Sequence, residues 1–185
     1  LPLGCLLILD EAYSEFAPAA SLPSLEVTDT RVVRLRTFSK AYGMAGARVG
    51  YAMAEENLIK SFEKIRNHFG MNRVAQKAAF EALSDNQWLL EMVQKVENGR
   101  QRIYKIAASN NLKSITSSTN FVAIDCGKDG SFAKKVLTEL ISLGIFVRMP
   151  FVSPQDRCIR ISVGKKKDLD KFETAFPIAL ERASK

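Results

Sequence analysis

The sequence has few of the residues that crosslink a fold or bind metals. Its 185 residues include three cysteines, Cys5, Cys126 and Cys158, and a single histidine, His68. So few cysteines, in an odd number, exclude a small disulfide scaffold and favour a reducing compartment such as the cytoplasm. Cysteine, histidine and acidic residues nowhere have the spacing of a metal site, so we expect no metal.

Long apolar runs are also absent. No stretch approaches the roughly 20 apolar residues that cross a membrane, so we expect no membrane-spanning helix and no membrane partner. Residues 1–9 (LPLGCLLIL) resemble a signal-peptide core, but they lack a basic leader, and Asp10 and Glu11 follow in place of a cleavage site. A buried strand is the better interpretation.

The rest of the composition is that of a globular protein. Hydrophobic residues make up 46% and charged residues 25% of the chain, which excludes disordered, collagen-like and coiled-coil proteins. The formal net charge of +7 allows a nucleic-acid or other anionic partner. The basic residues are scattered, however, and the densest run, Lys165–Lys167, is followed by acidic residues. We therefore expect a solvated surface and no nucleic-acid partner.

Apolar patterning divides the chain into two parts. In residues 1–83 we expect strands over 5–9, 31–36 and 48–53 and helices over 55–69 and 74–83. The first strand is a continuous apolar run, which is typical of a parallel sheet covered on both faces. This part is expected to belong to a larger α/β domain with a mostly parallel sheet and flanking helices.

Residues 84–185 are expected to form a long linking helix and a small α+β domain. The helix has an apolar stripe from Trp88 to Ile106 and ends near residues 109–111. After it we expect strands over 120–125, 145–148 and 158–163, a helix over 131–143, and a last helix that begins at Asp168 and is kinked or restarted at Pro177.

Polar residues follow the strands of the first part, where ligands bind in open α/β sheets. They are Asp10, Tyr13, Thr37, Ser39, Lys40 and Arg48. A lysine in a pocket can form a Schiff base with a carbonyl, and hydroxyls with an arginine can hold a phosphate. A carboxylate and a phenol can bind a heteroaromatic ring. Pyridoxal phosphate (PLP) is a cofactor that needs all of these groups.

Four stretches carry a resemblance to a known family. They are LLILDEAYSEF at 6–16, RTFSKAYGMAGARVGY at 36–51, TNFVAI at 119–124, and GIFVR with CIRISVG within 144–164. In their order and spacing the chain resembles fold-type I PLP enzymes, and among them the C-terminal half of the histidinol-phosphate aminotransferases. We therefore expect it to be part of a longer class I/II aminotransferase of amino-acid biosynthesis, active as a cytoplasmic homodimer.

The resemblance also implies roles for single residues. Lys40 is the catalytic Schiff-base lysine, Asp10 pairs with the pyridine nitrogen, Tyr13 bonds the 3′ oxygen, and Thr37, Ser39 and Arg48 hold the phosphate. Arg160 binds the carboxylate or phosphate of the substrate, and Asn120 and Arg148 are further substrate candidates. Outside such a motif these side chains would be ordinary surface or core residues.

The substrate is left open by the sequence. The family implies a small amino acid or an amino-alcohol phosphate as donor and a 2-oxo acid as acceptor. Residues 66–73 (RNHFGMNR) differ from the proline- and serine-containing loop expected of histidinol-phosphate enzymes. Two alternatives stay open: a PLP-dependent lyase or decarboxylase on the same fold, and an inactive fragment that acts as a binding module.

Overall fold

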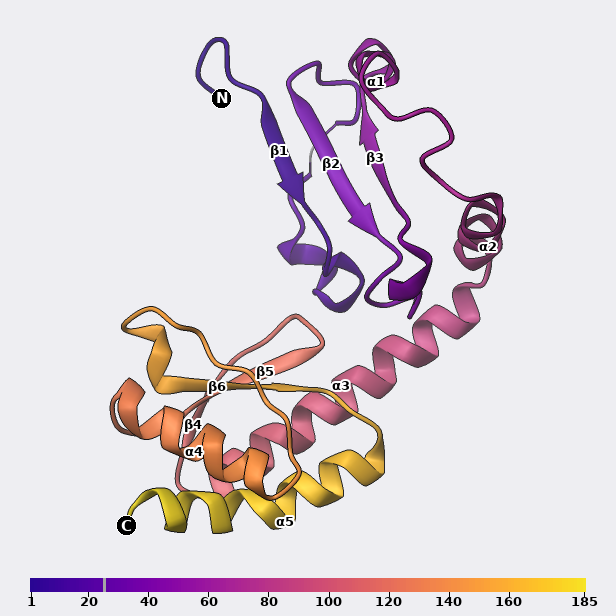
Figure 1. The fold of residues 1–185 in the computed structure, drawn as a ribbon. Coiled ribbons are helices and arrows are strands. Elements are labelled where there is room, and N and C mark those ends of the chain that lie inside the picture. Colours follow the sequence, from indigo (N-terminus) through magenta and orange to yellow (C-terminus); the bar gives the residue numbers. More distant parts are fainter. Residues whose placement is uncertain (25) are drawn as a thin grey trace. The chain divides into compact units, whose positions relative to one another are not determined.

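The computed structural model describes residues 1–24 and 26–185 (Figure 1). Contacts between residues divide the chain into two compact units, Leu1–Val93 and Gln94–Lys185. The division falls inside a long helix, later in the chain than the boundary at 83 and 84 expected from the sequence.

The first unit is built on a three-stranded sheet in the order β1-β2-β3. Its strands are β1 (Leu7–Asp10), β2 (Val32–Thr37) and β3 (Gly50–Ala54), and its helices are α1 (Glu56–Glu63), α2 (Arg73–Ser84) and the start of α3 (Asn86–Ser109). β1 and β2 are parallel, whereas β2 and β3 are antiparallel, as the arrows in Figure 1 show. The α/β class is as expected, but within this chain the sheet is mixed rather than mostly parallel. The link from β2 to β3 holds no α-helix, which a parallel neighbour usually needs.

β1 is an edge strand, and the expected burial on both of its faces is wrong for this chain. Its residues alternate between half-buried and exposed, and Ile8 is 61% exposed. Only β2 pairs with β1 among residues 1–24 and 26–185, so the other edge of β1 is open as well.

The helix expected over 55–69 is shorter than its apolar spacing indicates. α1 ends at Glu63, and Phe69 has a left-handed backbone (φ 57°) that an α-helix cannot contain. His68 therefore lies exposed in a loop and not at a helix end.

The second unit contains an antiparallel sheet in the order β4-β5-β6. Its elements are the rest of α3, β4 (Lys113–Ile115), β5 (Phe121–Asp125), α4 (Gly130–Ser142), β6 (Cys158–Ser162) and α5 (Lys166–Ala183). The strand expected over 145–148 does not form, because Arg148 makes only an isolated bridge with Arg160. α5 begins at Lys166 and continues through Pro177.

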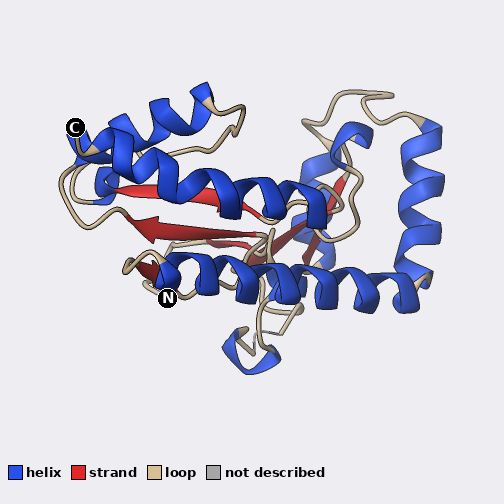
Figure 2. Cartoon of the chain, turned by 90° about the horizontal axis from the view of Figure 1, so that it is seen from below, coloured by secondary structure: helices blue, strands red, loops and turns tan. Residues whose placement is uncertain are grey.

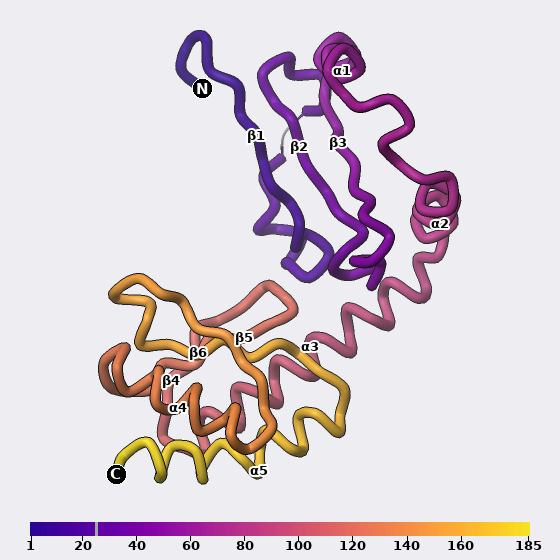
Figure 3. Tube along the Cα trace, viewed as in Figure 1, coloured from indigo at the N-terminus to yellow at the C-terminus, as the bar shows by residue number. Residues whose placement is uncertain are grey.

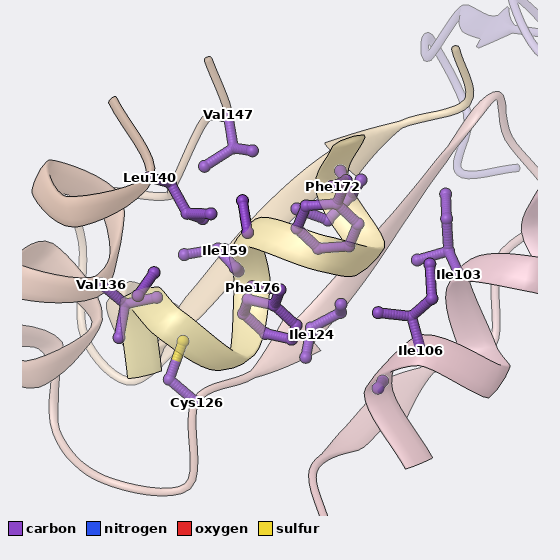
Figure 4. Close-up of a cluster of buried hydrophobic side chains, with 14 of the residues drawn as sticks. Ile103, Ile106, Ile124, Cys126, Val136, Leu140, Val147, Ile159, Phe172 and Phe176 are labelled. Carbon is purple, nitrogen blue, oxygen red and sulfur yellow. The ribbon is translucent and has the colours of Figure 1, made fainter. Parts of the chain in front are cut away.

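One apolar core holds the second unit together. Val122, Ile124, Ile159 and Ile161 come from one face of its sheet and are 3% exposed or less. They pack with side chains of α3, α4 and α5, which lie alongside the strands (Figure 2). Figure 4 shows side chains of this core pointing toward one another: Ile103, Ile106, Ile124, Cys126, Val136, Leu140, Val147, Ile159, Phe172 and Phe176.

Helices able to cross a membrane are not found anywhere in the part of the chain that the structure describes. The same residues contain no group of three or more histidine, cysteine, aspartate and glutamate side chains that could hold a metal ion.

Candidate functional site

The ends of β1 and β2 and the start of β3 meet at one edge of the first sheet (Figure 3). Asp10 ends β1 and pairs with Leu35 of β2, two residues before Thr37. Thr37 ends β2 and pairs with Gly50 at the start of β3. The polar residues that follow the strands are therefore gathered at this edge, as the rule for α/β sheets predicts.

Gly50 allows β2 and β3 to approach each other at this edge. A Cβ atom on Gly50 would lie 2.7 Å from the carbonyl oxygen of Arg36, which is closer than real side chains approach a backbone. A glycine is therefore required where the two strands begin to pair.

Tyr13 and Lys40 come together at the edge. Asp10 Oδ1 accepts a hydrogen bond from the backbone N–H of Ala12 at 3.0 Å. Such a bond is typical of a turn, and Tyr13 follows directly after it. The Nζ atom of Lys40 lies 5.2 Å from the centroid of the Tyr13 ring, within the range of a cation–π contact. Asp10 is exposed, and Tyr13 and Lys40 are half-buried. An amine, a phenol and a carboxylate thus all come from segments at this one edge.

Thr37, Ser39 and Arg48 belong to the two ends of the loop between β2 and β3. Thr37 Oγ1 accepts a hydrogen bond from the backbone N–H of Ser39 at 3.0 Å, which fixes the start of the loop. Arg48 has a left-handed backbone (φ 54°), and its Nη1 donates to the carbonyl of Ala45 at 2.8 Å. The guanidinium is exposed and keeps further N–H donors, so it can bind an anion.

A buried carboxylate lies on the other face of this edge. Glu11 is 5% exposed, and its Oε1 accepts from Arg34 Nη2 at 2.6 Å while Oε2 accepts from Arg36 Nε at 3.1 Å. Burial disfavours the charged form, but the hydrogen bonds and charges of the two guanidiniums outweigh it, so the pKa of Glu11 lies below its ordinary value. This cluster was not predicted from the sequence. The pattern that could have indicated it is the pair of arginines, Arg34 and Arg36, at alternate positions of a strand.

Arg160 lies on the face of the second sheet that is opposite the core. Its Cζ atom is 4.3 Å from the centroid of the Phe121 ring, and its buried Nε has no hydrogen-bond partner within residues 1–24 and 26–185. A buried donor without a hydrogen-bond partner raises the free energy of the folded state, and a hydrogen bond to an anionic ligand would lower it again.

Arg148 is brought next to Arg160 by a backbone bridge. The N–H of Arg160 donates to the carbonyl of Arg148 at 2.6 Å. Directly opposed residues share a face of a sheet, so both arginines are on the same face. The carbonyl of Asn120 accepts from Val163 N–H at 2.9 Å, at the point where β5 begins. These three residues belong to the second unit, whereas all the cofactor candidates belong to the first.

Comparison with known proteins gives the family. The family model for aminotransferase class I and II matches residues 3–176. Histidinol-phosphate aminotransferase of Geobacillus sp. (strain WCH70) is 38% identical over 176 residues, which cover 93% of this chain and 47% of that protein. The enzyme of the same name from Bacillus subtilis (strain 168) is 37% identical over 175 residues, with 93% and 48% covered. The chain thus spans about half the length of the curated relatives it matches.

A solved structure agrees with these relatives. The crystal structure of histidinol-phosphate aminotransferase from Sinorhizobium meliloti, in complex with pyridoxal-5′-phosphate, aligns with a TM-score of 0.94 at 49% sequence identity. The alignment covers 98% of this chain and 50% of that one. The resemblance and the α/β fold class inferred from the sequence are confirmed, and the chain belongs to the class I and II aminotransferases.

Proposed function

We propose that this chain carries the cofactor-binding lysine of a PLP-dependent aminotransferase. The observation that carries the proposal is the position of Lys40, with its amine 5.2 Å from the Tyr13 ring at the sheet edge where Asp10 and Thr37 end their strands. The side chains gathered there have the chemistry that PLP requires: an amine, a carboxylate, a phenol and donors for a phosphate.

Each residue of this edge would have a distinct task. Lys40 would hold the aldehyde carbon of the cofactor and move a proton to and from the substrate. Asp10 would keep the pyridine nitrogen protonated, and Tyr13 would donate a hydrogen bond to the 3′ oxygen on the cofactor ring. The phosphate would be held by Thr37, Ser39 and Arg48. When bound, PLP supplies an electron sink for the bond that breaks at the substrate's α-carbon.

Substrate recognition is assigned to the second unit. Arg160 would bind the carboxylate or phosphate of the substrate, assisted by Arg148 and Asn120. The unpartnered Nε of Arg160 and its neighbour Arg148 support an anionic substrate. The names of the relatives support a histidinol-phosphate-like amino donor, with a 2-oxo acid as acceptor.

The whole enzyme is proposed to be a cytoplasmic homodimer. Residues 1–83 would be the C-terminal portion of the PLP-binding large domain, and residues 84–185 would be the linking helix and the small domain. The three cysteines are all free thiols, which supports a reducing compartment.

Replacement of Lys40 by alanine tests the proposal in the full-length enzyme. We expect turnover of an amino-alcohol phosphate donor with a 2-oxo acid to fall by at least about 10³-fold, because the group that binds the cofactor and moves the proton is lost. The adduct that borohydride traps between protein and PLP should also disappear. Lys60→Ala is the matched control, since Lys60 is an exposed lysine on α1 whose side chain pairs with Glu56.

Two results would count against the proposal. Retained turnover and a retained adduct in Lys40→Ala would refute the role of this lysine. Release of carbon dioxide without a keto-acid product from wild-type enzyme would favour a decarboxylase on the same fold.

A further inference from the structure

Where β1 and β2 end, the two faces of the first sheet carry different side chains. In the ladder, Asp10 pairs with Leu35, and Arg36 pairs with Tyr51. Paired residues share a face and successive residues alternate between faces. Asp10 and Thr37 therefore belong to one face, and Arg34, Arg36 and Tyr51 belong to the opposite face.

Glu11 belongs to the face of the arginines. Its backbone N–H donates to the carbonyl of Leu35 at 2.9 Å, so the ladder between β1 and β2 continues through this residue. Its carboxylate binds Arg34 with both oxygens, at 3.0 Å and 2.6 Å, and also accepts from Arg36 at 3.1 Å. The side chain of Glu11 is 2% exposed, and those of Arg34 and Arg36 are 14% and 25% exposed.

The cluster reaches the third strand through Arg36. Burial lowers the pKa of Arg36, but hydrogen bonds to Glu11 and to Tyr51, together with the charge of Glu11, more than compensate and raise it. Glu11, Arg34, Arg36 and Tyr51 therefore form one polar brace across β1, β2 and β3.

We propose that Glu11 is a positioning residue that fixes the register of β1 against β2 and thereby holds Asp10 level with the loop that carries Lys40. A slip of two residues keeps each side chain on its own face but moves Asp10 by about 7 Å along the strand. Backbone hydrogen bonds do not discriminate against such a slip, because every residue offers the same donor and acceptor. The contact of Glu11 with both Arg34 and Arg36 does discriminate against the slip, because Glu11 can reach both arginines in one register only.

This inference rests on the proposed function, since Asp10 and Lys40 matter together only if both touch one cofactor. A positioning role for Glu11 and a purely stabilising ion pair predict different results. An ion pair that only stabilises the fold would lower the melting temperature and leave the folded site unchanged. A positioning residue would change how the folded site binds PLP.

The test compares Glu11→Gln with wild type in the full-length enzyme. Glutamine keeps the size of the side chain but removes the charge that attracts both guanidiniums. We expect the dissociation constant for PLP, measured by absorbance titration of the cofactor-free protein, to rise at least about fivefold. The pH midpoint at which the visible band of bound PLP changes should shift too, because that band reports on the surroundings of Lys40 and Asp10. Both readouts are taken where circular dichroism shows folded protein.

Asp29→Asn is the matched control. Asp29 lies in the same unit and loses the same charge, but its partner, Arg31, is exposed, and the pair lies at the start of β2, away from the site. We expect wild-type values for both readouts in this variant.

Specific outcomes would overturn the inference. A lower melting temperature in Glu11→Gln, with wild-type PLP affinity and an unchanged PLP band, would show that the brace only stabilises the fold. If Glu11→Gln does not fold, Arg36→Lys is measured instead, because lysine keeps the positive charge but lacks the guanidinium. A shifted pH midpoint of the PLP band in this variant supports the inference, and an unchanged midpoint refutes it. A wild-type enzyme that takes up no PLP would refute the proposed function instead.

Discussion

Two adjacent carboxylates of the first unit have opposite surroundings. Asp10 is exposed and accepts a hydrogen bond from the backbone N–H of Ala12. Glu11 is buried between two guanidiniums. The alternation of a strand separates neighbours in sequence onto opposite faces, so one carboxylate is available to a ligand while the next one serves the fold.

The pH dependence of stability should show the contribution of Glu11. Its pKa in the folded state lies below the ordinary value of 4.5, so the stabilisation is complete above about pH 4.5 and is lost as the pH falls through the folded-state pKa. We expect Glu11→Gln to lower the free energy of unfolding by about 1–3 kcal/mol at neutral pH. The gap to wild type, measured by urea unfolding, should close in acid, and a gap that stays constant down to pH 2 would contradict this account.

The sequence indicated which polar residues follow the strands of the first sheet, but not the contacts behind them. The places of Asp10 and Thr37 at the ends of β1 and β2 follow from apolar runs, and Lys40 follows from a local motif. The contacts of Glu11 join residues 23 and 25 positions apart, and they depend on the register of two strands. No pattern within a single segment contains that register.

At the scale of helices and strands, periodicity was reliable where an element was long. The apolar stripe from Trp88 to Ile106 predicted α3, which spans Asn86–Ser109. β4 has only three residues and is too short to show alternation. Residues 145–148 have strand-like composition, but they form one isolated bridge, because the formation of a strand depends on a partner along its whole length. The antiparallel direction of β3 was likewise a property of the pairing and not of the segment.

A comparison within α5 tests how the second unit is stabilised. Phe176 is fully buried and its ring centroid lies 4.9 Å from that of Phe172, whereas Ile178 on the same helix is 39% exposed. We expect Phe176→Ala to lower the free energy of unfolding by about 3–5 kcal/mol, because a large cavity remains in the core. Ile178→Ala should cost less than about 1 kcal/mol. Equal losses in the two variants, measured by urea unfolding with circular dichroism, would show that this core is misassigned.

At the scale of the whole chain, the two units differ in how much core they contain. The core of the second unit draws on α3, α4, α5 and two strands. A cluster of buried side chains in the first unit is built on Phe38, Val49, Ala75 and Ala79, while Ile8 of β1 remains exposed. All the cofactor candidates lie in the first unit, where strand pairing and the polar brace help to position them.

The three cysteines differ in reactivity because of where the fold places them. Cys5 is exposed, whereas Cys126 and Cys158 are buried. Burial, with the nearby Cys158, raises the pKa of Cys126 to about 12, and burial also raises the pKa of Cys158. Since the thiolate is the reactive form, we expect one thiol of the native 185-residue chain to react rapidly with a chromogenic disulfide and three to react in urea. Two fast thiols in the native chain would contradict the burial.

Cys5 lies just before β1, the edge strand of the first sheet. A fluorophore attached to this one accessible thiol would therefore mark the start of that strand, without an engineered cysteine and without removal of the native ones. Its emission would report on changes in the surroundings of the start of β1.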